Sequence, residues 1–280
     1  MDLPGHSLLH ADRDGAHVSV ALEGGHVVRW CPAFGGEALY LSPLAAEHPA
    51  RAIRGGVPVI FPQFDDLGPL PRHGFARTAK WQETQPQPDE ALALVLTDSA
   101  ETREHWPHAF RLTLGLAVES PPTSDADGLR LALRVRNVGG EPFAFTAALH
   151  TYLRVGDVER VRVEGLGGTR YRDKTADGRR AVQEGPLRVR GPLDSVYERA
   201  PDRVVVRDEA AGRLIEVEKS GFEDVVVWNP WREGAAGLVD LPEEDYRRML
   251  CVEAAQVHRP AVVDAGATWE GIQTITVRAR

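Results

Sequence analysis

His150 lies in the stretch A-A-L-H-T-Y-L, where most of its neighbours in the chain are apolar or small. Histidine titrates near neutral pH, so such a side chain can donate a proton and recover it within one catalytic cycle. The sequence therefore offers His150 as a general acid. The alternative is a core histidine whose ring is satisfied by a backbone carbonyl, and the neighbouring residues do not decide between the two.

Glu253 is the single carboxylate in M-L-C-V-E-A-A-Q-V, a run of mostly apolar or small residues. Burying a carboxylate is costly unless it is paired, and burial raises its pKa toward neutral, as a general base requires. The alternative is an outward-facing glutamate on an edge strand. Alternation permits both, because Leu250, Val252 and Ala254 share the other face and can fill the core alone.

Further polar residues gather in one segment, I-R-G-G-V-P-V-I-F-P-Q-F-D-D-L-G-P-L-P-R-H-G-F-A-R. Its cationic and titratable members are Arg54, Arg72, His73 and Arg77. The Gly55–Gly56 pair permits left-handed or crowded backbone, and the prolines stiffen the segment. A rigid loop with several guanidinium groups can hold a carboxylate or phosphate through forked hydrogen bonds. The alternative is a surface loop whose arginines pair with some of the 41 acidic residues.

Two other stretches contain weaker candidates. Asp194, in P-L-D-S-V-Y, has the chemistry to bind sugar hydroxyls, but an aspartate beside a serine more often makes a turn or a cap. In V-V-W-N-P-W, Trp228 and Trp231 flank Asn229. Aromatic faces stack against the C–H faces of sugars, although large aromatic side chains more often belong to a core.

The overall composition narrows the choice of partner. A formal net charge of −8 over 280 residues disfavours nucleic acid, so a small anion is the expected partner of the arginine-rich segment. Cys31 and Cys251 are expected to be reduced thiols, and no zinc-type spacing is present. The first residues lack a signal-peptide pattern, and no stretch approaches the ~18 apolar residues of a membrane span. We therefore expect a cytoplasmic protein without a membrane partner.

Strands must position these side chains, because alternation of apolar and polar residues dominates the chain. It is clear in L-A-L-R-V-R (131–136), V-R-V-E (161–164) and T-I-T-V-R (274–278), and a period of two is typical of a strand with one wet face. Further strands are expected near Val18, Leu94, Leu114 and Val226, and helical patterns are confined to residues 42–48 and 100–106. The sequence predicts an all-β protein that forms a single domain over residues 1–280.

Taken together, these stretches resemble the aldose 1-epimerase (galactose mutarotase-like) superfamily, and within it the glucose-6-phosphate 1-epimerases, or D-hexose-6-phosphate mutarotases. The matching stretches are I-R-G-G-V-P-V-I-F-P-Q-F, G-P-L-P-R-H-G-F-A-R, A-L-H-T-Y-L, G-P-L-D-S-V-Y, V-V-V-W-N-P-W, M-L-C-V-E-A-A-Q-V and A-G-A-T-W-E-G-I-Q. The likeness runs in order from about Gly24 to Ile275. It implies a β-supersandwich of large antiparallel sheets with a sugar site in a cleft on one sheet.

The resemblance also implies a role for each candidate residue. It assigns the acid to His150 and the base to Glu253. Its implied substrate-binding residues are Arg54, Gln63, His73, Arg77 and Asp194, with Arg72 as a further candidate for contact with a phosphate. Three positions depart from the family's pattern: Asp65 stands where relatives often have Gly, Arg72 where many have Gln or Ser, and Arg259 where Lys is commoner.

The implied reaction is the interconversion of the α and β anomers of a hexose 6-phosphate by acid/base ring opening and closure. It requires neither a metal nor another cofactor, and a monomer is expected. Two alternatives stay open at this point. One is a non-catalytic sugar-phosphate-binding protein on the same fold, because a fold does not fix a function. The other is a mutarotase for unphosphorylated aldoses.

Overall fold

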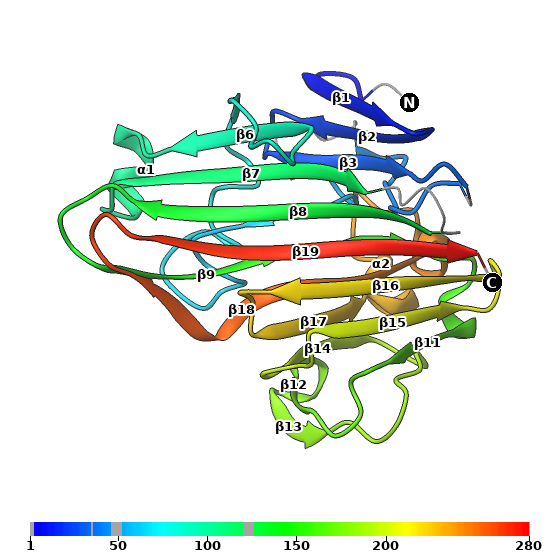
Figure 1. Ribbon diagram of the computed structural model, residues 1–280. Coiled ribbons are helices and arrows are strands. Elements are labelled where there is room, and N and C mark those ends of the chain that lie inside the picture. The colour runs from blue at the N-terminus through cyan, green and yellow to red at the C-terminus, as the bar shows by residue number, and fades with distance from the viewer. Residues whose placement is uncertain (1–2, 35, 46–51, 120–125, 280) are drawn as a thin grey trace.

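The computed structural model describes residues 3–34, 36–45, 52–119 and 126–279, and within them two large antiparallel sheets lie one behind the other (Figure 1). The outer sheet is in front in Figure 1, and the site sheet lies behind it. This arrangement confirms the all-β expectation. The expected helix over residues 42–48 falls partly outside the described residues.

The outer sheet has eight strands. In spatial order they are β11 (Val161–Glu164), β15 (Arg203–Asp208), β16 (Arg213–Ser220), β19 (Thr268–Ala279), β8 (Ala126–Asn137), β7 (Phe110–Glu119), β6 (Leu92–Thr97) and β5 (Gln82–Glu83). Each strand expected from alternation near Leu94, Leu114, Leu131, Val161 and Ile275 is present in this sheet.

The site sheet has seven strands in one path and an eighth that pairs with β18 alone. The path is β13 (Arg179–Val182), β12 (Arg170–Asp173), β14 (Leu193–Tyr197), β17 (Asp224–Asn229), β18 (Met249–Val263), β9 (Phe143–Leu149) and β4 (Val59–Ile60), and the eighth strand is β10 (Tyr152–Arg154). A small third sheet contains β1 (Leu8–Arg13), β2 (Ala16–Ala21) and β3 (His26–Cys31).

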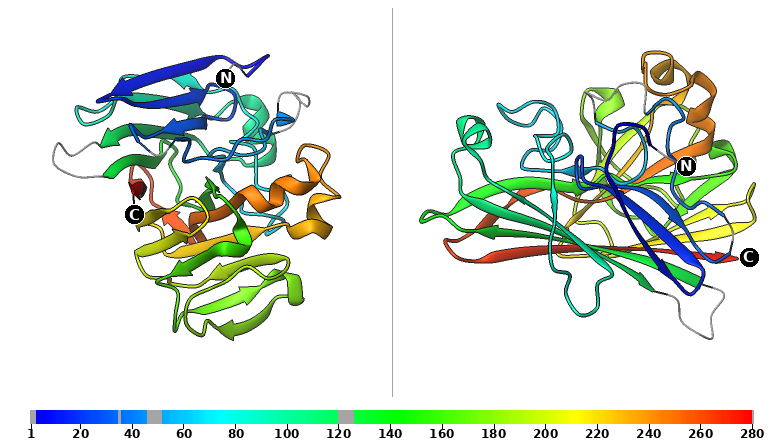
Figure 2. Two further views of the ribbon diagram at one scale, coloured as in Figure 1. Left: turned by 90° about the vertical axis from the view of Figure 1, so that its right-hand side faces the viewer. Right: turned by 90° about the horizontal axis from the view of Figure 1, so that it is seen from above.

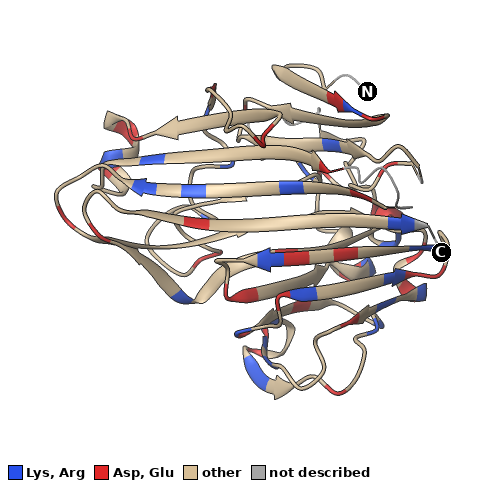
Figure 3. Cartoon of the chain, in the orientation of Figure 1, with Lys and Arg blue, Asp and Glu red and all other residues tan. Residues whose placement is uncertain are grey.

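Alternate residues of both large sheets fill one continuous core. Leu131, Leu133 and Val135 of β8 and Val252 and Ala254 of β18 belong to the same buried cluster. The other face of the outer sheet is wet and has both signs of charge, and Figure 3 shows the interspersed acidic and basic positions. Cross-strand ion pairs such as Arg134–Glu270 and Arg203–Glu216 link neighbouring strands there. Exposed pairs of this kind contribute little each, but opposite charges across strands favour the observed register.

Helical segments are few and short, as expected. In the part of the chain that the structure describes, the α-helices are α1 (Ala100–His105) and α2 (Trp231–Ala235), and the 3-10 turns include η2 (Val158–Arg160), η3 (Lys174–Ala176) and η4 (Glu243–Arg248). Helix α1 confirms the expectation for residues 100–106, and Ser99 and Thr102 cap it reciprocally. No helix in the described ranges has the length and apolar character needed to cross a bilayer.

The loops that extend from the site sheet stand on the side away from the outer sheet (Figure 2). One is the segment between β4 and β5, which contains Arg72 and Arg77, and another is the α2–η4 segment between β17 and β18. Under them lies a second, smaller apolar cluster. It consists of Ile60, Phe64, Ala148, Val196, Val226, Ala255 and Val257. The site sheet therefore faces the core with one side and a loop-covered cavity with the other.

Candidate active site

A cavity of about 200 Å³ opens on the loop-covered face of the site sheet. It gathers seven of the eight residues named as site candidates from the sequence, and Gln63 is the one that does not line it. The lining residues are Arg54, Phe64, Arg72, His73, Arg77, His150, Tyr152, Lys174, Asp194, Val226, Trp228, Leu238 and Glu253.

Strand register brings His150 and Glu253 together at its floor. Leu149, the last residue of β9, pairs with Ala254 of β18, and β10 resumes with Tyr152 opposite Cys251. His150 stands in the gap between β9 and β10, level with Glu253, and its Nε2 lies 3.4 Å from Glu253 Oε1. Because β17 and β9 flank β18, the alternative of an edge-strand glutamate is wrong.

Burial moves the pKa values of these two groups in opposite directions. The side chains of His150 and Glu253 are 12% and 1% exposed. Burial, followed by the charges of His73 and Arg54, holds the pKa of His150 well below its ordinary value of 6.5. Burial, followed by the charge of Asp194, holds the pKa of Glu253 well above its ordinary value of 4.5. An acid and a base poised in this way are typical of a site that moves protons.

Two glycines allow the arginine segment to close over the sheet. Gly56 has a φ of +60°, and a Cβ there would lie 2.1 Å from the carbonyl oxygen of Val27. Gly74 has a φ of +68°, and a Cβ there would lie 2.3 Å from the carbonyl oxygen of Phe61. No other residue type fits either position without a shift of backbone. This confirms the expectation of left-handed, crowded backbone next to Arg54.

Three N–H groups of Arg54 are bound by other side chains of the protein. Its Nε and Nη2 donate to the carboxylate of Asp240 at 3.1 and 3.2 Å, and its Nη1 donates to the hydroxyl of Tyr152 at 3.0 Å. The Tyr152 hydroxyl and the Asp240 carboxylate keep the pKa of Arg54 above its ordinary value despite burial. Arg54 therefore contributes positive charge to the cavity from a fixed position.

Arg77 has no such partner. Its Nη2 donates to the backbone carbonyl of Arg72 at 2.8 Å, and its buried Nε has no hydrogen-bond partner. No carboxylate of the described residues forms an ion pair with it, and burial lowers its pKa. An unmatched guanidinium at a cavity wall is a ready ligand for an anion.

His73 is held as a neutral donor. Its Nδ1 accepts the N–H of Asp65 at 3.1 Å, which leaves the hydrogen on Nε2. Burial, with the charge of Arg77 second, lowers the pKa of His73 to about 2. Its ring lies edge-on to His150, with 5.7 Å between centroids. A neutral imidazole N–H can donate to a sugar oxygen.

The structure uses Gln63 differently from the sequence expectation. Its amide nitrogen donates to the carbonyls of Asp65 and Leu70, and its amide oxygen accepts the N–H of Leu70. These bonds close the turn that precedes Arg72. In this structure Gln63 shapes the loop, and its role as a substrate ligand stays a prediction.

Asp194 lies in β14 rather than at a turn or a cap, and an ammonium group holds its carboxylate. Lys174 Nζ is 3.0 Å from Asp194 Oδ2 and also pairs with Asp65. The other carboxylate oxygen of Asp65 is 2.6 Å from Arg72 Nε.

Trp228 of β17 also lines the cavity, whereas Trp231 packs on Tyr246 with 5.3 Å between ring centroids. Sequence reasoning missed Lys174, Asp240 and the hydroxyl of Tyr152, although Tyr152 lies in a quoted motif.

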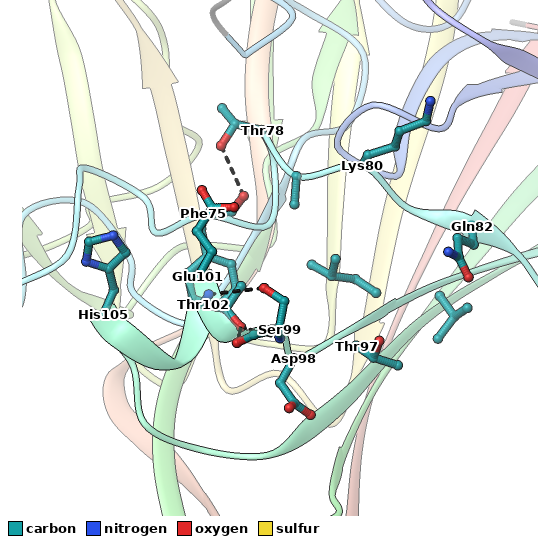
Figure 4. A pocket seen from close by; sticks show the side chains of 13 residues that line it. Phe75, Thr78, Lys80, Gln82, Thr97, Asp98, Ser99, Glu101, Thr102 and His105 are labelled. Carbon is teal, nitrogen blue, oxygen red and sulfur yellow. Dashed lines mark hydrogen bonds between the residues drawn. The ribbon is translucent and has the colours of Figure 1, made fainter.

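Two further hollows lie near this cavity. One, of about 300 Å³, shares Arg54, Arg77, His150 and Tyr152 with it and adds Thr78 and Asp240. The two form one continuous site on either side of the arginines. The other hollow, of about 410 Å³, lies beside α1 (Figure 4), where Asp98 is paired with Arg103 and Ser99 caps the helix. Its polar groups serve the fold.

No group of three or more His, Cys, Asp or Glu side chains within the described ranges is arranged to hold a metal ion. The polar groups of the cavity instead include the His150–Glu253 pair, cation–anion pairs such as Lys174 with Asp194, and the unmatched guanidinium of Arg77. That set of side chains can transfer protons and bind an anion.

Comparisons with known proteins agree with this geometry. A family model described as "Aldose 1-epimerase" matches residues 7–276. A protein of Cenchrus ciliaris named "Putative glucose-6-phosphate 1-epimerase" is 37% identical over 263 residues, which is 90% of this chain and 78% of that protein. A protein of the same name from Escherichia coli (strain K12) is 37% identical over 254 residues, 89% of this chain and 82% of that protein.

A solved structure is also similar. The crystal structure of "a putative mutarotase (YeaD)" from Salmonella typhimurium has a TM-score of 0.87 and 32% identity, and the match covers 100% of this chain and 92% of that one. The family match, the two relatives and this structure each span most of the chain. Together with the buried His150–Glu253 pair, they show that the chain belongs to the aldose 1-epimerase family.

Proposed function

We propose that the protein interconverts the α and β anomers of a hexose 6-phosphate, with glucose 6-phosphate as the first substrate to test. The relatives named above support the substrate class. The observation that carries the proposal is Arg77, an unmatched cation beside a buried acid/base pair. A sugar phosphate supplies both the anion for Arg77 and the anomeric hydroxyl for His150 and Glu253.

The two connected hollows suggest how the substrate lies. The pyranose ring takes the side with Asp194, Trp228 and Glu253, where a carboxylate can accept from hydroxyls and an aromatic face can cover the ring. The phosphate takes the side with Arg54 and Arg77. Arg72 is a further contact for the phosphate, because only its Nε is bound to Asp65.

The chemistry needs one proton taken and one given. Glu253 removes the proton of the C1 hydroxyl while His150 donates a proton to the ring oxygen. The bond from C1 to the ring oxygen breaks, and the carbonyl at C1 forms. After rotation about C1–C2, the former ring oxygen attacks the other face of the carbonyl, and the two groups return their protons. Positioned acid and base groups contribute roughly 10²- to 10⁴-fold each.

The resting protonation state suits this cycle. With the pKa of Glu253 raised and that of His150 lowered, the pair holds one proton, mainly on the carboxyl. The 3.4 Å contact between His150 Nε2 and Glu253 Oε1 lets that proton pass to the imidazole without leaving the cavity. A bound phosphate also offsets the charges of Arg54 and Arg77, which lower the pKa of His150.

The test is anomer exchange measured by NMR on glucose 6-phosphate and on free glucose at equal concentrations, with the spontaneous rate subtracted. We expect fast exchange on the phosphate ester. Glu253→Gln should abolish it, because the amide cannot take the proton of the C1 hydroxyl. Arg77→Ala should raise KM for the ester roughly 10- to 100-fold, as expected for a lost hydrogen bond to a charged group.

Glu104→Gln, on the exposed face of α1, and Arg259→Ala, at an exposed position of β18, are matched controls that should leave the rates unchanged. Equal acceleration of both sugars, with KM unaffected in Arg77→Ala, would identify a mutarotase for unphosphorylated aldoses. No acceleration of either sugar, with retained binding of the ester, would identify a non-catalytic binding protein.

A further inference from the structure

Lys174 is a cavity residue that neither acid/base transfer nor phosphate binding has used. It begins the short η3 turn after β12, and its side chain is 21% exposed. Its ammonium group lies 3.0 Å from Asp194 Oδ2, pairs with Asp65 and stands 6.0 Å from the centroid of the Phe64 ring. It therefore bridges the strand that presents Asp194 and the loop that presents the arginines.

The partner of Lys174 on the loop side is itself fixed. Asp65 has a φ of +51°, its N–H donates to His73 Nδ1, and its second carboxylate oxygen is 2.6 Å from Arg72 Nε. Lys174 is thus the third group in a chain of alternating charge that ends at Asp194. Asp194 has no other partner among the ion pairs and hydrogen bonds of the described residues, so Lys174 alone restrains its carboxylate.

We propose that Lys174 is a positioning residue that holds the Asp194 carboxylate in one orientation and in its charged form, so that Asp194 can accept hydrogen bonds from sugar hydroxyls. This inference rests on the proposed function for its substrate. The inference identifies Lys174 as the residue that keeps Asp194 a hydrogen-bond acceptor on the sugar side of the cavity. A neutral aspartic acid in a free rotamer would present a donor as often as an acceptor.

Electrostatics make the charged form of Asp194 dependent on Lys174. Burial raises the pKa of Asp194, and the charge and hydrogen bond of Lys174 act against that rise. The other charged or titratable groups that face Asp194 come from the arginine-rich segment, β18, β10 and the break after β9. They are Asp65, Arg72, His73, Arg77, Arg54, Glu253, Cys251, Tyr152 and His150. The charge of Asp65 raises the pKa of Asp194, and loss of Lys174 removes the positive charge that lies 3.0 Å from the Asp194 carboxylate.

The direct test is a pH titration of the Asp194 carboxyl by carbon-13 NMR, assigned with Asp194→Asn. In Lys174→Met the titration midpoint should move upward from that of the wild type. Lys174→Arg, which keeps the charge, should recover most of the shift, and the exposed Lys80→Met should show none. An unchanged midpoint in a folded Lys174→Met protein would overturn the inference, whatever the protein's activity.

A binding experiment tests the consequence for ligands. The 1-deoxy analogue of glucose 6-phosphate lacks the anomeric hydroxyl and cannot open, so calorimetry with it measures affinity without turnover. Lys174→Met should weaken its binding roughly tenfold or more, and the loss should grow as pH falls, because Asp194 then becomes neutral at a higher pH than in the wild type. Turnover at saturating glucose 6-phosphate should change less than threefold.

A double-mutant cycle separates positioning from direct contact with the phosphate. If Lys174 acts through Asp194, the double variant Asp194→Asn/Lys174→Met should bind no more weakly than Asp194→Asn alone. The 1-deoxy sugar without phosphate should lose the same factor as its phosphate ester. Additive losses, or a loss confined to the ester, would make Lys174 a phosphate ligand instead. If the double-mutant cycle gives the expected coupling but the protein does not accelerate anomer exchange, that result would count against the proposed function and not against the role of Lys174.

Discussion

The pKa values of His150 and Glu253 have been moved from their ordinary values in opposite directions. An ordinary glutamate ionises near 4.5 and an ordinary histidine near 6.5, whereas here the carboxyl is raised and the imidazole is lowered. The form that starts ring opening, with an ionised glutamate and a protonated histidine, is therefore the minor arrangement of a state that holds one proton. Two strongly coupled groups titrate as a pair, so this one-proton state persists over a wide range of pH.

This order of pKa values predicts a broad plateau of turnover against pH. The normal order would confine activity to the interval between 4.5 and 6.5. Because the pKa of Glu253 is raised, the basic limb is expected to follow loss of the proton that the pair shares, and turnover should persist above pH 6.5. Exchange at saturating glucose 6-phosphate between pH 5.5 and pH 9 measures this, and a fall centred near pH 6.5 would contradict it.

At the scale of single residues, the sequence indicated most of the candidate side chains that the fold gathers around one cavity but not how they are paired. The mostly apolar neighbours of Glu253 and His150 marked both as candidates, but only the strands that flank β18 show that Glu253 is not on an edge strand. Asp65 and Arg72 each stand out as departures from the family's pattern, but only the fold shows that they bind one another. The Arg54–Asp240 pair joins residues 186 positions apart, which no local pattern reports.

At the scale of elements, the break between β9 and β10 is what frees His150 to face the cavity. The break leaves backbone groups of β18 without neighbours, and a residue of the outer sheet satisfies them. Gln273 of β19 accepts the N–H of Ala254 at 2.9 Å and donates to the hydroxyl of Thr151 at 2.6 Å. Ala254 and Thr151 directly follow Glu253 and His150, so the outer sheet supports both catalytic candidates from behind.

Gln273→Leu should therefore affect both stability and chemistry. The substitution leaves the N–H of Ala254 and the hydroxyl of Thr151 without a hydrogen-bond partner, which costs about 1–3 kcal/mol for each group left unpaired. Loss of alignment between acid and base should lower kcat roughly tenfold or more with a smaller change in KM. Urea unfolding and anomer exchange measure the two effects, with Gln82→Leu on the exposed strand β5 as the control. A destabilised variant with unchanged kcat would confine Gln273 to a structural role.

The strands themselves were predictable because one-sided burial imprints a period of two on the sequence. Strands β7, β8 and β19 were predicted in this way, and so was the inward set of β18. The order of strands within each sheet was not, because it depends on which distant faces meet. Gln273 shows the limit: its neighbours T-W-E-G-I-Q-T-I give a strand, but nothing in them identifies a bond to Thr151, 122 positions away.

At the scale of the whole molecule, stability depends on histidines that are buried without charge. His26 donates from Nε2 to the carbonyl of Gly55 at 2.7 Å and supports the turn next to Arg54. Burial lowers its pKa from 6.5 to about 4. His73 and His150 are lowered as well. Because the unfolded chain binds these protons more readily, their contribution to stability is present above pH 6.5 and is lost as pH falls toward the folded pKa values.

We therefore predict a steep loss of unfolding free energy between pH 6.5 and pH 4.5. Lowering the pKa of His26 from 6.5 to about 4 corresponds to about 3 kcal/mol of stability. His26→Gln keeps a donor for the carbonyl of Gly55 but cannot be protonated, so its stability should depend less on pH. Urea unfolding at several pH values measures this, and equal slopes for the variant and the wild type would contradict it.

The direct contact of His150 with Glu253 also has a consequence for how the site acts on a mixture of sugar anomers. One proton moves from carboxyl to imidazole before ring opening, and ring closure on either face restores the same starting state. No step needs a proton from bulk water, so the cavity can stay sealed around the open-chain sugar for as long as the bond rotates. Such a catalyst has no preferred direction. It shortens the time to the anomeric equilibrium and leaves the equilibrium ratio untouched.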